Sequence, residues 1–174
     1  MNKTELVATM AAKTGVSKKD TEAVLNAEVV TLSRMAYRVI NEIGGKTETN
    51  LSKCGKAMLV YSILNNNKKD LKFLGKTDEN VDMAETAITE FKKHGISVEQ
   101  LKQEAENQQD IYLKNKLQDM CTIYENFEKQ LQGKYIDETD LLTILAENVD
   151  NTTLFSDSSV YIDEFAGFTS QEYE

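Results

Sequence analysis

The sequence predicts an α/β fold that is predominantly helical. Proline is absent from the 174 residues, and long stretches are rich in Lys, Glu, Gln, Asn and Leu, a composition that favours helices. Apolar residues recur at helical spacing along most of the chain, whereas only "EVVTL" and "VYIDEF" are compact enough for strands. A chain of this length can form one domain with a substantial core.

The two ends of the chain differ in charge. The formal net charge is −9, from 29 acidic and 20 basic residues, so the surface as a whole should repel a phosphate backbone. Residues 1–27 hold four lysines and three acids, which gives them +1 and leaves the rest of the chain at −10. Any contact with nucleic acid must therefore be local.

Cysteine content and hydropathy exclude several classes of protein. Cys54 and Cys121 lie far apart and belong to no Cys-x-x-Cys or Cys/His cluster, so the sequence lacks the ligand sets of zinc and iron–sulfur sites. No apolar run approaches the roughly 20 residues needed to span a bilayer, and the N-terminus lacks the apolar core of a signal peptide. We expect a cytoplasmic protein with no membrane contact.

The N-terminal half begins with two short helices, over residues 2–14 and 17–27. Each starts with a capping-box pattern, Asn2 with Glu5 and then "SKKD", and Gly15 separates them. Residues 28–32 are β-branched and predict a strand. Ser33 is then expected to cap a helix that ends at Gly44 and Gly45. An alternative is that residues 29–32 continue the preceding helix.

Residues 51–133 are expected to be a helical insert of capped segments, the first of which "NNNKKD" breaks. Ser52 can cap the first segment, Ser97 and Gln100 can form a capping box, and residues 111–131 are the clearest amphipathic segment. Its apolar stripe is more typical of core than of a cofactor site. The stripe consists of Leu113, Leu117, Met120, Tyr124, Phe127 and Leu131.

The C-terminal part predicts a helix over 137–149, with Leu141, Leu142 and Leu145 inward, and a strand over 160–165. Thr169 and Glu172 form a last capping box, so we expect a further helix to continue beyond Glu174. Asp163 and Glu164 end the strand, where many nucleotide-hydrolysing folds present a carboxylate to magnesium. Acids that merely cap the strand or face solvent are an equal alternative.

The first 27 residues resemble the N-terminal helical hairpin of the bacterial histone-like HU proteins, through "MNKTEL" and "G-x-S-K-K-D". That resemblance implies that Lys3, Lys18 and Lys19 face a DNA backbone. The arms with which HU proteins grip the minor groove, tipped with an intercalating proline, have no counterpart here. An HU-like DNA-binding function is therefore an alternative to the main hypothesis and not the expected function.

Residues 28–174 resemble the B subunit of the AddAB-type ATP-dependent helicase/exonuclease, in its clostridial form. The likeness rests on "EVVTLSRMAYRVINEIGGKT", "KFLGKTDEN", "GKYIDETDLLTILAENV" and "YIDEFAGFTSQEYE". It implies DNA and the A subunit as partners, ATP and magnesium as cofactors, and double-strand break repair by recombination as the role. The nuclease domain and iron–sulfur cluster of that family belong to its C-terminal part and are absent here.

The same stretches are similar, more distantly, to UvrD/Rep-type helicases. The similarity implies an incomplete helicase domain: a strand and helix over 28–45, a helical insert over about 51–133, the "D-x-x-D-L-L" helix over 137–149, and a Walker B-like strand over 160–165. It also implies that Thr31, Ser33, Arg34 and Arg38 contact DNA phosphates. The two arginines, the only ones in the chain, could instead pair with surface acids.

Nucleotide hydrolysis needs a phosphate-binding loop as well as an acid for magnesium, and no G-x-x-x-x-G-K-[ST] occurs in this chain. Asp163 and Glu164 are thus half of a site, and Ala166 and Gly167 replace the helicase residues that couple hydrolysis to movement. We expect a fragment of the subunit that is inactive alone, joined near residues 27–31 to the HU-like hairpin. The alternatives are a nucleoid protein with an unrelated tail and a helical interaction module.

Overall fold

The structure is a computed structural model. It describes residues 3–24, 28–45, 48–76, 80–156, 158–162 and 167–173, with the side chains of residues 23, 24 and 76 left aside.

The described chain is predominantly helical, as the sequence predicts. The N-terminal elements are α1 (Lys3–Thr14), α2 (Lys18–Val24), α3 (Leu32–Glu42) and β1 (Thr49–Asn50). The insert follows with α4 (Lys53–Asn66), the 3-10 turn η1 (Leu74–Lys76), α5 (Asn80–Lys93), α6 (Val98–Asn107) and α7 (Ile111–Leu131). The last elements are β2 (Tyr135–Ile136), α8 (Asp140–Asn148), η2 (Val149–Asn151) and α9 (Ser170–Tyr173).

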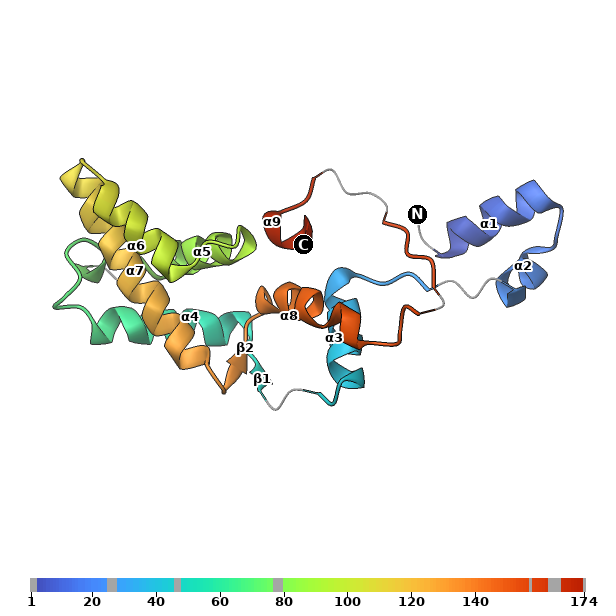
Figure 1. The fold of residues 1–174 in the computed structure, drawn as a ribbon, viewed down its shortest axis with the longest axis horizontal. Coiled ribbons are helices and arrows are strands. Elements are labelled where there is room, and N and C mark those ends of the chain that lie inside the picture. The colour runs from blue at the N-terminus through green and yellow to red at the C-terminus, as the bar shows by residue number, and fades with distance from the viewer. Residues whose placement is uncertain are drawn as a thin grey trace.

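These elements form three groups in space. Figure 1 shows α4, α5, α6 and α7 together at one end, α3 and α8 side by side in the middle, and the α1–α2 hairpin apart at the other end. The parallel pair β1–β2 lies at the base of the insert, with Thr49 opposite Tyr135 and Asn50 opposite Ile136. The sheet thus brings together the two ends of an insert of more than eighty residues, which spans β1 to β2.

The predicted strand over 28–32 is wrong. Residues 28–31 have no regular secondary structure, and Leu32 is already the first residue of α3. The predicted cap at Ser33 is also wrong, because the Oγ1 atom of Thr31 accepts a hydrogen bond from the Arg34 amide at 3.2 Å. A hydroxyl three residues before a free helix amide is the preferred N-cap, so the helix starts two residues earlier than expected.

The predicted strand over 160–165 is not formed in its described part. Val160, Tyr161 and Ile162 lie outside any strand and are 56%, 89% and 61% exposed. A strand requires a neighbour for its backbone groups, and the described sheet contains only β1 and β2. Asp163, Glu164, Phe165 and Ala166 lie outside the described residues.

The predicted helix caps are largely confirmed. Ser52 caps α4, Ser97 and Gln100 form a complete capping box on α6, and Thr169 and Glu172 exchange hydrogen bonds at α9. The Ser17 hydroxyl accepts from the Asp20 amide at the start of α2. The predicted partner of Glu5, Asn2, lies outside the described residues. Local side-chain chemistry therefore sets most of these boundaries.

The main core belongs to the helical insert. The stripe of α7 is buried from Met120 onward, with Phe127 and Ile123 fully enclosed, and Leu117 packs at its edge. Leu113 departs from the prediction, since 43% of it is exposed at the start of the helix. The core also takes Val60, Ile63 and Leu64 from α4, Leu71 and Leu74 from the loop, Ala84 and Ile88 from α5, and Leu101 and Ala105 from α6.

A second, smaller cluster joins α3 to β2 and α8. Ala36 and Ile40 pack against Ile136, Leu141 and Ile144, with Leu145 at the edge. The inward positions of α8 are thus mainly Leu141 and Ile144, while Leu142 is only half-buried. Among the described residues the two clusters share no buried apolar residue, so apart from the β1–β2 pair a polar interaction connects them.

Buried charges make that connection. Lys56 of α4 is 6% exposed and donates to Asp137 at 2.7 Å, and Lys92 of α5 is 9% exposed and binds Asp140 at 2.6 Å. Lys92 also reaches Glu128 of α7 at 3.0 Å. Both ammonium groups lie 5.5–5.6 Å from the centroid of the buried Phe127 ring, a favourable cation–π arrangement. We call Lys56, Lys92, Asp137 and Asp140 the buried Lys–Asp network.

The network keeps Asp137 and Lys92 charged. Burial alone would raise the pKa of Asp137, but hydrogen bonding and attraction from Lys56, with a contribution from Lys92, hold that pKa below its usual value of 3.8. Burial would likewise lower the pKa of Lys92, yet Asp140 and Glu128 together raise it above its usual 10.5. Each charge is therefore stable only while its partners are in place.

Asp137→Asn should destabilise the fold strongly, because it leaves Lys56 buried without a counter-charge. We expect the free energy of unfolding to fall by roughly 3–5 kcal/mol, measured by urea titration. Glu125→Gln is the matched control, since it removes an acid that pairs with two exposed lysines, Lys102 and Lys129. The control should cost about 1 kcal/mol or less. Equal losses in the two variants would contradict the role of the network.

Stability should also depend on pH through this network. Because the folded pKa of Asp137 is depressed, its contribution is present above pH 3.8 and is lost as the pH falls through the folded value. Because the pKa of Lys92 is raised, its contribution is present below pH 10.5 and is lost at more alkaline pH. Urea titrations over a pH series should show an acid-side decline that is weaker in Asp137→Asn. An identical pH profile in the variant would refute this assignment.

Candidate functional site

The start of α3 presents the predicted DNA-contacting residues together. Thr31 and Arg34 are exposed, Ser33 is half-buried, and Arg38 lies one turn further along the same helix. Ala36, Val39 and Ile40 are buried on the opposite side. The amphipathic character of α3 therefore turns the arginines outward and anchors the helix to α8.

The two arginines differ in their partners. Arg38 binds the carboxylate of Glu28 at 2.6 Å, and both side chains are 48% exposed. The sequence allowed for such pairing of both arginines with surface acids. An ion pair this exposed contributes little to the stability of the fold. Arg34 forms no ion pair with any residue that the structure describes, so its guanidinium is available to an anion.

The other end of α3 is held by hydrogen bonds. Both carboxylate oxygens of Glu42 accept from the hydroxyls of Thr152 and Thr153, and the Thr153 amide donates at 3.2 Å. These hydrogen bonds lower the pKa of Glu42. Residues 152 and 153, which follow α8 and η2, thus hold the C-terminal end of α3. The N-terminal end of α3 remains exposed to solvent.

Lys3, Lys18 and Lys19 are exposed at the starts of α1 and α2. The hairpin that carries them buries only a small core, with Val7 and Ala11 at 6% and 8% exposure and Thr21 beside them. In Figure 1 the hairpin lies away from α3, so the two predicted groups of cations do not form one continuous surface.

The predicted magnesium ligands, Asp163 and Glu164, lie outside the described residues. Within the part of the chain that is described, no group of three His, Cys, Asp or Glu side chains is placed to hold a metal ion. The sequence also lacks a phosphate-binding loop. The described residues alone therefore provide neither a metal-ligand group nor a phosphate-binding loop for a magnesium–nucleotide complex.

The "D-x-x-D-L-L" motif has a structural use that its sequence alone did not indicate. Asp137 and Asp140 are the acidic half of the buried Lys–Asp network, and Asp140 also accepts from the Asp137 amide at 3.1 Å. Its basic half, Lys56 and Lys92, was missed. A signal existed for Lys92, because it continues the buried stripe of Ala84 and Ile88 at a spacing of four. A lysine at such a position requires a buried acid.

A cavity of about 540 Å³ lies between the insert and the β2–α8 segment. Glu48, Glu99, Glu125, Glu128 and Asp140 contribute carboxylates to its wall, against the single cation of Lys129. Hydrogen bonds from Lys102 and Lys129 hold the pKa of Glu125 at about 2, so this acid is charged at neutral pH. The excess of carboxylates over cations in the wall disfavours a phosphate group there.

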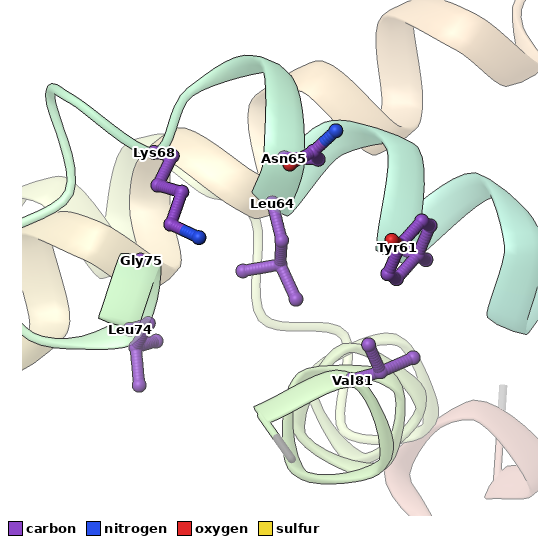
Figure 2. Close-up of a pocket in the computed structure, with 7 residues that line it drawn as sticks. All are labelled: Tyr61, Leu64, Asn65, Lys68, Leu74, Gly75 and Val81. Atoms are coloured by element: carbon purple, nitrogen blue, oxygen red, sulfur yellow. The ribbon is translucent and has the colours of Figure 1, made fainter. Parts of the chain in front are cut away.

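Figure 2 shows a much smaller pocket between α4, η1 and the start of α5. Its volume is about 10 Å³, room for about one water molecule. Gly75 is required there, since a Cβ atom would come within 2.8 Å of the Lys68 carbonyl oxygen. This pocket is a packing feature of the loop and not a ligand site.

None of the described helices is long and apolar enough to cross a membrane.

Comparison with known proteins places these features in a family. Residues 8–174 match the family described as "ADDB, N-terminal". The chain is 43% identical over 157 residues to the B subunit of the ATP-dependent helicase/deoxyribonuclease of Clostridium tetani, covering 87% of this chain. It is 38% identical over 166 residues, or 94% of the chain, to the corresponding protein of Clostridium botulinum strain Hall. The Acetivibrio thermocellus protein of the same name is 37% identical over 163 residues, or 91% of the chain.

The chain spans about a seventh of these relatives, 14% of the length of each. The family match, over residues 8–174, spans residues 27–31, where the sequence suggested a join, and includes most of the α1–α2 hairpin. The likeness of residues 1–27 to HU proteins stays a prediction. The resemblance of residues 28–174 to the B subunit is confirmed, and the chain belongs to the AddB N-terminal family.

Proposed function

We propose that this chain is part of the B subunit of an ATP-dependent helicase/deoxyribonuclease, and that it contacts DNA phosphates at the start of α3. One observation carries the proposal: Arg34 is exposed beside a capped helix start and has no carboxylate partner in the described chain. In a protein of net charge −9, an unpaired arginine at such a position is a local site for an anion.

The chemistry of this site suits a phosphate group. The amides of a helix start and the partial positive charge of its dipole favour an anion, and the guanidinium of Arg34 can donate two parallel hydrogen bonds to it. The hydroxyls of Thr31 and Ser33 lie in the same first turn. Arg38 can exchange its exposed pairing with Glu28 for a second phosphate at little cost. These contacts position DNA and read no sequence.

The proposal extends to the complete subunit. It would act in the cytoplasm with DNA and the A subunit of the complex, in double-strand break repair by recombination. Hydrolysis of ATP would supply the energy of movement, and magnesium, with Asp163 and Glu164 as ligands in the complete subunit, would neutralise charge on the phosphates. The described residues contribute DNA contacts and the rigid insert, and no nuclease step is assigned to them.

A nucleoid-type function of the α1–α2 hairpin is a second candidate. It is favoured by the separate position of the hairpin and the exposure of Lys3, Lys18 and Lys19. Lysines on short helices attract a phosphate backbone without sequence preference. This candidate places DNA binding at a different surface, so variants can separate the two.

Arg34→Ala should weaken DNA binding, because it removes a charge-assisted contact to phosphate. We expect the dissociation constant for a labelled duplex with a single-stranded tail to rise by about tenfold, measured by fluorescence anisotropy. The slope of log K against log salt should fall by about 1. Lys129→Ala, which removes an exposed lysine from α7, is the control and should change neither. Unchanged binding by the Arg34 variant would refute the α3 contact.

Joint substitution of Lys3, Lys18 and Lys19 by alanine tests the second candidate in the same assay. If α3 provides the contact, the triple variant should retain most of the affinity of the parent chain. Loss of binding in the triple variant, with Arg34→Ala unaffected, would transfer the DNA contact to the hairpin.

ATP hydrolysis by this chain alone should not exceed the background of phosphate release. The reason is that the sequence contains no loop able to hold the β- and γ-phosphates. A coupled phosphate-release assay with and without DNA is sufficient. Turnover that survives Asp163→Asn would point to contamination, whereas turnover abolished by it would contradict the expectation.

A further inference from the structure

Two aromatic side chains are exposed together at the start of α7. Tyr112 is 69% exposed and Phe73, from the loop before η1, is 45% exposed. Their ring centroids are 6.3 Å apart, with an angle of 89° between the ring planes. The start of α7, which carries Tyr112, lies at the end of the insert remote from α3 (Figure 1). Apolar residues scattered singly on a surface need no explanation, whereas grouped ones are typical of interaction sites.

The loop that carries Phe73 is rigidly held. The carboxylate of Asp119, only 3% exposed, accepts hydrogen bonds from the amides of Lys72, Phe73 and Leu74 at 3.0, 2.6 and 2.9 Å. Leu71 and Leu74 on either side are buried in the main core. Phe73 is therefore exposed by a fixed backbone and not by fraying, and its ring is preorganised for a ligand.

Two lysines, Lys72 and Lys116, lie on the segments that carry the two rings. The Nζ atom of Lys72 is bound by the amide oxygens of Asn115 and Gln118 at 3.0 and 3.2 Å, so its position is set while its charge is not neutralised. Lys116 is exposed one helical turn from Tyr112 and forms no ion pair with a described residue. The nearby Asp110 is engaged with the Tyr112 amide as the cap of α7.

We propose that Phe73, Tyr112, Lys72 and Lys116 bind single-stranded DNA, with bases stacked on the rings and phosphates at the two lysines. Unpaired bases expose the flat faces that such stacking requires, whereas a duplex keeps them inside. An acidic peptide could pair with the lysines but has no base to stack on the rings. The inference takes DNA as the ligand from the proposed function. It depends on no residue of α3.

The test is anisotropy with a labelled oligo-dT of about 12 nucleotides, in low salt, with the whole chain. The joint variant Phe73→Ala with Tyr112→Ala should raise the dissociation constant by about fivefold or more, because stacking is lost. Lys116→Ala should weaken binding and reduce the salt slope. Lys114→Ala is the matched control, since Lys114 is two residues away on another face and its Nζ atom binds the Glu106 carbonyl oxygen. The affinity of the Lys114→Ala variant for oligo-dT should equal that of the parent chain.

A second readout separates lost contact from lost folding. An oligonucleotide that carries iododeoxyuridine should crosslink on irradiation to Tyr112 in the unmodified chain, as located by peptide mass spectrometry. The inference is overturned if crosslinks fall elsewhere, or if the aromatic double variant binds oligo-dT as well as the parent chain does. It is also overturned if polyglutamate competes as well as unlabelled oligo-dT. If the aromatic double variant binds DNA normally while Arg34→Ala still weakens binding, this inference is overturned and the proposed contact at α3 stands.

Discussion

The buried Lys–Asp network is the interaction on which the arrangement of this chain depends. Lys56 and Lys92 come from the helical insert, and Asp137 and Asp140 come from the segment that carries α8. In the described part of the chain the two hydrophobic clusters share no residue, and the β1–β2 pair and these charges together align one with the other. A buried ion pair adds little stability over an apolar contact of the same size. Separating its partners is costly, because each charge is then buried without compensation.

This alignment determines where cations can face outward. Because α8 is held by the network, α3 packs on α8 with its apolar side, and Arg34 is directed to solvent at the start of the helix. The insert carries its own exposed group of lysines and aromatic rings at the far end. Each group is small, and both stand on a chain whose net charge is −9. Local placement of cations is thus what could allow so acidic a protein to approach DNA.

Periodicity and capping chemistry were sufficient to predict most helices. Ser52, Ser97 and Thr169 act at short range on amides of their own first turn, so their effect can be judged without the fold. Strands were predicted poorly for the opposite reason. The β-branched run before α3 finds no neighbouring strand, while Thr49–Asn50 pairs with Tyr135–Ile136, across more than eighty residues. Pairing over that separation leaves no local pattern.

The candidate surfaces divide in the same way. The sequence by itself determined the helical class, the acidic balance, the family, and the grouping of Thr31, Ser33, Arg34 and Arg38 within a few residues, because all of these depend on local order or composition. Only the tertiary structure decided that Arg38 pairs with Glu28 while Arg34 does not, and that Phe73 meets Tyr112. It alone also paired Lys56 with Asp137, 81 residues apart, because a buried charge selects its partner from whatever packing brings within reach.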